Sequence, residues 1–176
     1  WLKLLSAVAL VLVSVQGVMG GLRVTKASLL LAVLHGVAGQ LFLALIVSVA
    51  AFCSQRWRAA ELSSPLETGS DRTWVVALSG MLVGQLALGA ILRHTGKGVM
   101  PHLAVAAVVA TLAFVCGTRA WSQHQDRPPL ARLGSFLMVV TSLQLILGFA
   151  ALVASGARAP GQPPTVADVL FTTLHQ

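Results

Sequence analysis

Long apolar runs separated by short polar segments are the dominant pattern along the chain. Five of these runs contain no Asp, Glu, Lys or Arg and have about 17 to 25 residues each, and a helix rising about 1.5 Å per residue would then cross a bilayer core of roughly 30 Å. The five runs are Leu4–Gly20, Ser28–Phe52, Trp74–Leu92, Pro101–Thr118 and Leu133–Ala154. The pattern predicts five complete transmembrane helices.

A shorter apolar run closes the sequence. Residues 166–176, with Asp168 near their start, would rise only about 16 Å as a helix, which is half a bilayer. Because this run stops early and the sequence starts at Trp1 without a Met, we expect the chain to be part of a longer protein. We divide it into a transmembrane hairpin (1–52), a cytoplasmic loop (53–73) and a bundle truncated in its last helix (74–176).

Composition supports an all-α integral membrane protein. Of the 176 residues, 56% are hydrophobic and only 10% are charged, whereas a soluble domain has roughly a quarter charged residues. The net charge of +7 does not indicate nucleic-acid binding, because the basic residues are scattered between apolar runs without a basic stripe. With Trp1 in the cytoplasm, inside segments hold seven Lys and Arg residues and outside segments five, so this orientation is favoured.

A short motif recurs in alternate runs. Gln-x-x-x-Gly occurs as QGVMG, QLALG and QLILG, and the run that follows each copy contains a histidine: His35, His102 and His175. Three copies indicate duplicated helical hairpins. The glycine allows close helix approach and the glutamine can hydrogen-bond across the contact, so packing alone could explain these two residue types.

The three histidines are the candidate functional residues. All are predicted in helices that run from outside to inside, in the outer half of the membrane, and intramembrane ionisable side chains are costly unless they serve a function. Zinc and copper sites usually recruit Cys, carboxylate or Met donors as well, whereas haem iron needs only one or two imidazoles and an apolar slot. Small residues near His35 and His102 would leave room for a macrocycle; these are Gly36, Gly39, Ala104, Ala106 and Ala107.

Cations near the outer ends of these helices are candidates for binding haem propionates. Arg93, in LRHTGKG, is predicted in an outside loop beside His94, and Arg23 occupies the matching place in the first hairpin. Snorkelling arginines at the membrane interface are the alternative. His124, in the polar segment WSQHQDRPP, is predicted to be solvated.

Six segments, taken in their order and spacing, resemble the haem A synthase family. They are VQGVMGGLRVT, LAVLHGVAGQLFLALIV, GQLALGAILRHTGKG, MPHLAVAAVV, LQLILGFAALV and VLFTTLHQ. The resemblance runs over nearly the whole chain. It implies eight transmembrane helices in two related halves, of which this sequence would hold the third to the start of the eighth. It also implies a multi-pass enzyme of a bacterial cell membrane, with its histidine sites near the outer face.

The resemblance further implies an activity and a set of ligands. Such an enzyme oxidises haem O to haem A with the help of a b-type haem (heme b), receives haem O from a membrane haem O synthase and serves terminal oxidase assembly. His35 would ligate the substrate haem, and His102 and His175 the b haem. The family's catalytic glutamate lies on a helix outside this sequence, so no catalytic residue is assigned and the fragment alone is expected to be inactive. A non-catalytic haem electron carrier and a transporter or assembly protein whose histidines merely pack are the alternatives.

Overall fold

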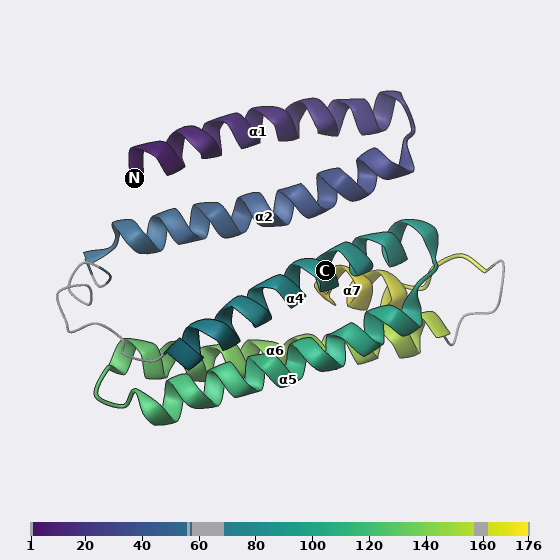
Figure 1. Cartoon of the computed structure of the whole chain (residues 1–176). Coiled ribbons are helices and arrows are strands. Elements are labelled where there is room, and N and C mark those ends of the chain that lie inside the picture. The colour runs from purple at the N-terminus through teal and green to yellow at the C-terminus, as the bar shows by residue number, and fades with distance from the viewer. Residues whose placement is uncertain (1, 56, 58–68, 157–161, 176) are drawn as a thin grey trace. The chain divides into compact units, whose positions relative to one another are not determined.

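The computed structural model describes residues 2–55, 57, 69–156 and 162–175, and these form helices without strands. The helices that it defines are α1 (Leu2–Thr25), α2 (Leu29–Cys53), α4 (Gly69–Thr95), α5 (Val99–Gln123), α6 (Pro128–Gly156) and α7 (Val166–His175) (Figure 1). All but α7 are long and apolar enough to cross a membrane. The predicted all-α, multi-pass membrane protein is confirmed.

Large apolar side chains cover the outer surfaces of these helices. Val76 is 63% exposed and Ile146 64% exposed, as expected of side chains that face lipid rather than water. The buried positions are instead mostly small residues, such as Ala9, Ala113 and Ala151, which let helices approach closely. Packing in this protein therefore relies on small residues at helix contacts.

The helices extend beyond the apolar runs that predicted them. α4 begins at Gly69 rather than Trp74, and α6 begins at Pro128 rather than Leu133. Proline suits the first position of a helix because its missing N–H would have no partner there. Hydropathy marks the lipid-crossing part of a helix, whereas hydrogen bonding continues the helix into the polar flanks.

Many hydroxyl groups within the helices are satisfied locally. They donate a hydrogen bond to the backbone carbonyl four residues earlier, which removes the cost of an unpaired polar group in lipid. This arrangement is found at Ser14, Ser48, Ser79, Thr111 and Ser142.

The chain forms two compact units. The first contains α1, α2 and the segment Leu82–Val105 from α4 and α5, and the second contains Gly69–Met81 of α4 and the described part of residues 106–176. The two units are described separately.

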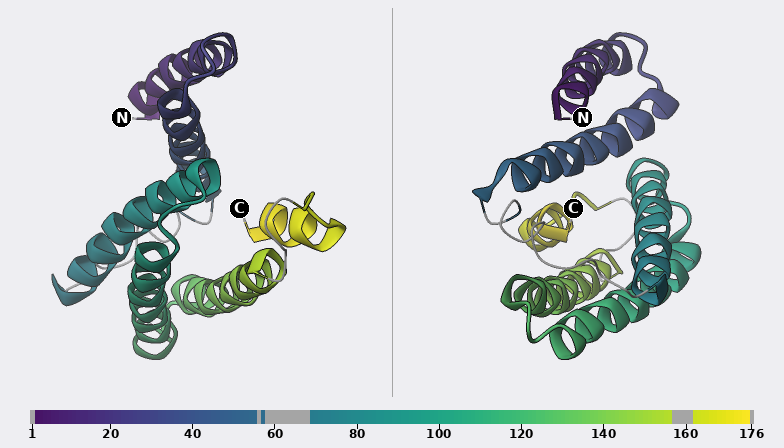
Figure 2. Two further views of the ribbon diagram at one scale, coloured as in Figure 1. Left: turned by 90° about the vertical axis from the view of Figure 1, so that its right-hand side faces the viewer. Right: turned by 60° about the vertical axis from the view of Figure 1, so that its left-hand side comes forward.

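In the first unit, tight connections join antiparallel helices. α1 and α2 lie side by side (Figures 1 and 2), and Ser28 caps α2 by accepting a hydrogen bond from the backbone N–H of Leu31. Ala27, with φ of 44°, turns the chain between them. Between α4 and α5, Gly96 and Gly98 have φ of 66° and 94°, a region that glycine adopts without strain.

In the second unit, α5 and α6 cross where two glycines meet. A Cβ added to Gly134 would lie 2.5 Å from the carbonyl oxygen of Gly117 and 2.8 Å from the backbone nitrogen of Trp121. The two backbones are thus in direct contact, which only glycine permits. α7 packs against α6 (Figure 2).

Candidate haem-ligand site

The first hairpin brings the glutamine, glycine and histidine of the repeat together. Nε2 of Gln16 donates a hydrogen bond to the backbone carbonyl of His35 at 3.1 Å. One turn further along α1, a Cβ added to Gly20 would lie 3.2 Å from Cε1 of His35, so the imidazole edge rests against this glycine. A Cβ on Gly39 would meet Nε2 of Gln16 at 2.9 Å, so Gly39 makes room for the amide in turn.

The second hairpin brings the same three residue types together, but here the glutamine contacts the imidazole rather than the backbone. Nε2 of Gln85 lies 3.3 Å from Nε2 of His102, and a Cβ on Gly89 would lie 3.3 Å from Cε1 of the same ring. Ala106 follows His102 by four residues, as Gly39 follows His35. A small residue therefore stands one turn after the histidine in both hairpins.

The third hairpin has the same pairing between α6 and α7. Nε2 of Gln144 donates to the backbone carbonyl of His175. A Cβ on Gly148 would lie 2.6 Å from Cε1 and 3.0 Å from Nδ1 of His175, so the ring lies closer to its glycine here than in the first two hairpins. The hydrogen bond that the sequence predicted across the helix contact is thus present in all three hairpins.

The three contacts occupy equivalent places in their hairpins. Gly20, Gly89 and Gly148 lie five, six and eight residues before the ends of their helices, which corresponds to about 8–12 Å of helix rise. All three imidazoles are half-buried. Each hairpin therefore holds a partly accessible imidazole at a similar distance from its closed end.

The ring of His35 has one buried nitrogen. Its Nδ1 is buried in the α1–α2 interface, so Nε2 is the nitrogen through which this ring can reach a ligand. Haem iron takes one or two imidazoles, whereas zinc needs three or four donors. No group of three or more His, Cys, Asp or Glu side chains suited to a metal ion occurs among the described residues.

One expectation about small residues needs correction. Gly39 was expected to leave room for a macrocycle, but the space beside it is filled by the amide of Gln16. A Cβ on Gly36, by contrast, would have no neighbour within 4 Å, so this glycine leaves an open surface on α2. The sequence did contain a signal for the role of Gly39. Gly39 follows His35 by four residues, just as Gly20 follows Gln16, so in an antiparallel hairpin each glycine can face the polar side chain of the other helix.

The two candidate propionate-binding arginines lie in the last turns of their helices, and both are exposed. Arg23 belongs to the last turn of α1, and Arg93 with His94 to the last turn of α4 rather than to a loop. Arg23 follows Gly20 by three residues and Arg93 follows Gly89 by four. Each arginine is therefore on the helix face that carries the glycine.

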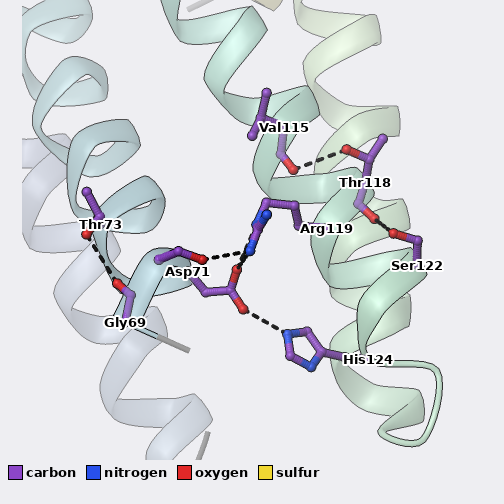
Figure 3. A network of polar contacts seen from close by, with 9 residues as sticks. Gly69, Asp71, Thr73, Val115, Thr118, Arg119, Ser122 and His124 are labelled. Carbon is purple, nitrogen blue, oxygen red and sulfur yellow. Dashed lines mark hydrogen bonds and ion pairs between the residues drawn. The ribbon is translucent and has the colours of Figure 1, made fainter. Parts of the chain in front are cut away.

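The prediction that His124 is solvated is wrong. Its Nε2 lies 3.0 Å from Oδ2 of Asp71, whose Oδ1 accepts from Arg119 at 2.7 Å (Figure 3). Ser70 also contacts the Arg119 guanidinium, at 2.8 Å. The polar sequence around His124 gave no hint of this network, because its partner Asp71 is 53 residues away along the chain.

Asp168 has a structural role that the sequence could have shown. Its Oδ2 accepts from the backbone N–H and the hydroxyl of Thr165, and its own N–H donates to that hydroxyl. This is a capping box at the start of α7, with the spacing Thr-x-x-Asp visible in TVAD. The Asp168 side chain therefore caps the N-terminus of α7.

No protein-family model, curated protein or solved structure matches the chain. Its function is therefore inferred from its own residues and their geometry.

Proposed function

We propose that this chain is a haem-binding membrane protein of the haem A synthase type, which oxidises haem O to haem A with the help of a b-type haem. The observation that carries the proposal is the repeated placement of an imidazole against a glycine near the closed end of a hairpin. A residue that only packs in lipid has no need of an ionisable ring, and such rings in membranes are functional by default. The same placement three times supports a shared ligand chemistry.

Each candidate residue has a role in this proposal. His35 ligates the iron of the substrate haem, and His102 and His175 ligate the b-type haem, which supplies the redox chemistry when bound. Arg23 and Arg93, at the ends of α1 and α4, pair with haem propionates. The partners that follow are a membrane haem O synthase that supplies the substrate and a terminal oxidase that receives the product.

Visible spectroscopy tests haem ligation directly. The purified chain should show reduced-minus-oxidised bands of b-type haem, and these bands should weaken in His102→Ala and in His175→Ala. His94→Ala is the matched control, because His94 is exposed in the last turn of α4 and should leave the bands unchanged. A folded chain without haem bands would instead indicate a packing role for the histidines and a transport or assembly function.

A non-catalytic haem electron carrier is the second candidate. Such a carrier needs only imidazole ligands, which the half-buried His35, His102 and His175 can supply without a catalytic acid or base. Incubating a haem-loaded protein that also carries the family's glutamate-bearing helix with haem O, and extracting the pyridine haemochrome, separates the two candidates, because only the enzyme yields the shifted band of a formyl haem.

A further inference from the structure

Two polar atoms lie buried in the interface between α1 and α2. Oε1 of Gln16 and Nδ1 of His35 are both shielded from solvent, and neither has a hydrogen-bond partner among the described residues. A buried polar group without a partner costs about 1–3 kcal/mol. One of the two atoms is a carbonyl oxygen, and the other is a ring nitrogen that can carry a proton.

The surrounding contacts place the Gln16 amide and the His35 ring in the same α1–α2 interface. The Gln16 amide already bonds to the backbone of His35 through Nε2, at 3.1 Å, which leaves Oε1 on the same amide as an acceptor. Gly39 provides the space for the amide, and Gly20 provides the space for the imidazole. An imidazole N–H and an amide oxygen are a donor and an acceptor that can satisfy each other.

We propose that Gln16 is a positioning residue for His35, with its Oε1 accepting a hydrogen bond from Nδ1–H of the imidazole. This bond fixes the neutral tautomer in which Nε2 is unprotonated and available to a metal. Histidines that ligate metals usually donate their other N–H to an oxygen acceptor in this way. The role as a support for haem ligation rests on the proposed function, but the hydrogen bond itself does not.

The glutamine also contacts the histidine residue in the other two hairpins, but through different atoms. Nε2 of Gln85 lies 3.3 Å from Nε2 of His102, which is the other ring nitrogen from the one proposed for His35, and Gln144 bonds to the backbone of His175. A glutamine serving only to join helices could bond to any backbone carbonyl along the interface. In all three hairpins its partner is the histidine residue.

The tautomer of His35 is measured first, in the haem-free chain labelled with ¹⁵N-histidine in detergent micelles. Comparison with His35→Ala assigns its signals, and the wild-type chain should show Nδ1 protonated and Nε2 unprotonated. Gln16→Leu removes both the acceptor and the donor and should abolish this preference. Gln16→Glu keeps an oxygen acceptor but lacks the amide donor, so it should restore the tautomer only if acceptance from Nδ1–H is what matters.

Gln40→Leu is the matched control, because Gln40 is an exposed glutamine of the same hairpin and should leave the tautomer unchanged. The inference is overturned if wild-type His35 carries its proton on Nε2, or if Gln16→Leu leaves the Nδ1–H tautomer in place.

Titration with iron protoporphyrin IX then tests the link to ligation, in a chain that also carries His102→Ala and His175→Ala. Gln16→Leu should weaken haem binding by about 10- to 100-fold, and Gln16→Glu should recover most of that loss and lower the reduction potential of the bound haem. If haem does not bind although the tautomer behaves as expected, the Gln16–His35 hydrogen bond stands and the proposed function fails.

Discussion

An imidazole occupies the space beside the glycine of each Gln-x-x-x-Gly motif. Adding a methyl group at such a glycine should therefore lower the free energy of unfolding, and more so where the imidazole is closer. A Cβ on Gly148 would lie 2.6 Å from Cε1 of His175, whereas one on Gly20 would lie 3.2 Å from Cε1 of His35. Gly148→Ala should therefore cost about 1–3 kcal/mol in free energy of unfolding, and Gly20→Ala less. Unfolding by SDS in mixed micelles, followed by circular dichroism, measures both.

Gly21→Ala is the control for these substitutions, because a Cβ there would have no neighbour within 4 Å. Alanine is also a better helix former than glycine, so this variant should be neutral or slightly more stable. An equal loss of stability in Gly21→Ala and Gly20→Ala would mean that the imidazole contact is not the cause.

Residue-scale features were predictable from the sequence where they depend on near neighbours or on a repeat. The Gln-x-x-x-Gly copies and the histidine after each of them identified residues that meet in space, because a short hairpin brings consecutive helices together. The Asp71–His124 pair was not predictable, since it joins the start of α4 to the segment after α5. No local sequence pattern around Asp71 or His124 predicts their contact.

At the scale of helices, the α5–α6 crossing depends on direct contact between two backbones. A Cβ on Gly134 would come within 2.5 Å of the Gly117 carbonyl oxygen, and a backbone atom cannot move aside as a side chain can. Gly134→Ala should therefore lower the free energy of unfolding by at least the 1–3 kcal/mol typical of overpacking. The thermal unfolding midpoint in dodecyl maltoside provides the measurement.

Gly80→Ala serves as the comparison, since a Cβ at Gly80 would have open space within 4 Å. If Gly134→Ala and Gly80→Ala had equally small effects on the unfolding midpoint, the backbones of α5 and α6 would not be in contact at Gly134.

The ion-pair network of Asp71 links α4 to the end of α5 and the segment beyond it (Figure 3). The side chains of Asp71 and Arg119 are only 22% and 27% exposed, so water screens this pair weakly. Asp71→Asn removes the charge that both Arg119 and His124 contact and should cost about 1.5–3 kcal/mol. The same thermal unfolding experiment reports the loss.

Asp126→Asn is the matched substitution, because the Asp126 side chain is 74% exposed and lies 3.7 Å from Arg127. An exposed pair of this kind contributes about 0–1 kcal/mol. The prediction fails if the two variants lose the same stability.

The helices themselves were largely predictable, and their ends were not. Each apolar run became a helix because lipid leaves the backbone no other way to satisfy its hydrogen bonds within one segment. The extra turns at Gly69–Thr73 and Pro128–Arg132 lie outside the apolar core. In the first, Ser70 and Asp71 contact Arg119, and the second begins with Pro128, which suits the first position of a helix. Hydropathy carries no information about those turns.

At the scale of the whole molecule, five spans fix which connections share a side of the membrane. The connections at 26–28 and 96–98 each follow an odd-numbered span, and the connection at 124–127 follows an even-numbered one. The distribution of Lys and Arg, seven against five, favours Trp1 and the 124–127 connection in the cytoplasm. The closed ends of the hairpins that hold His35 and His102 are then expected at the outer face.

Cysteine labelling tests this orientation. In a background of Cys53→Ser and Cys116→Ala, Lys97→Cys should react with a membrane-impermeant maleimide in intact cells, and Gln125→Cys only after lysis. Lys26→Cys is the internal check, because it lies in the other outer connection and should behave like Lys97→Cys. Since the charge bias is only two residues, the reverse pattern would place the histidines near the cytoplasmic face, and haem would then have to enter and leave the proposed sites from that side.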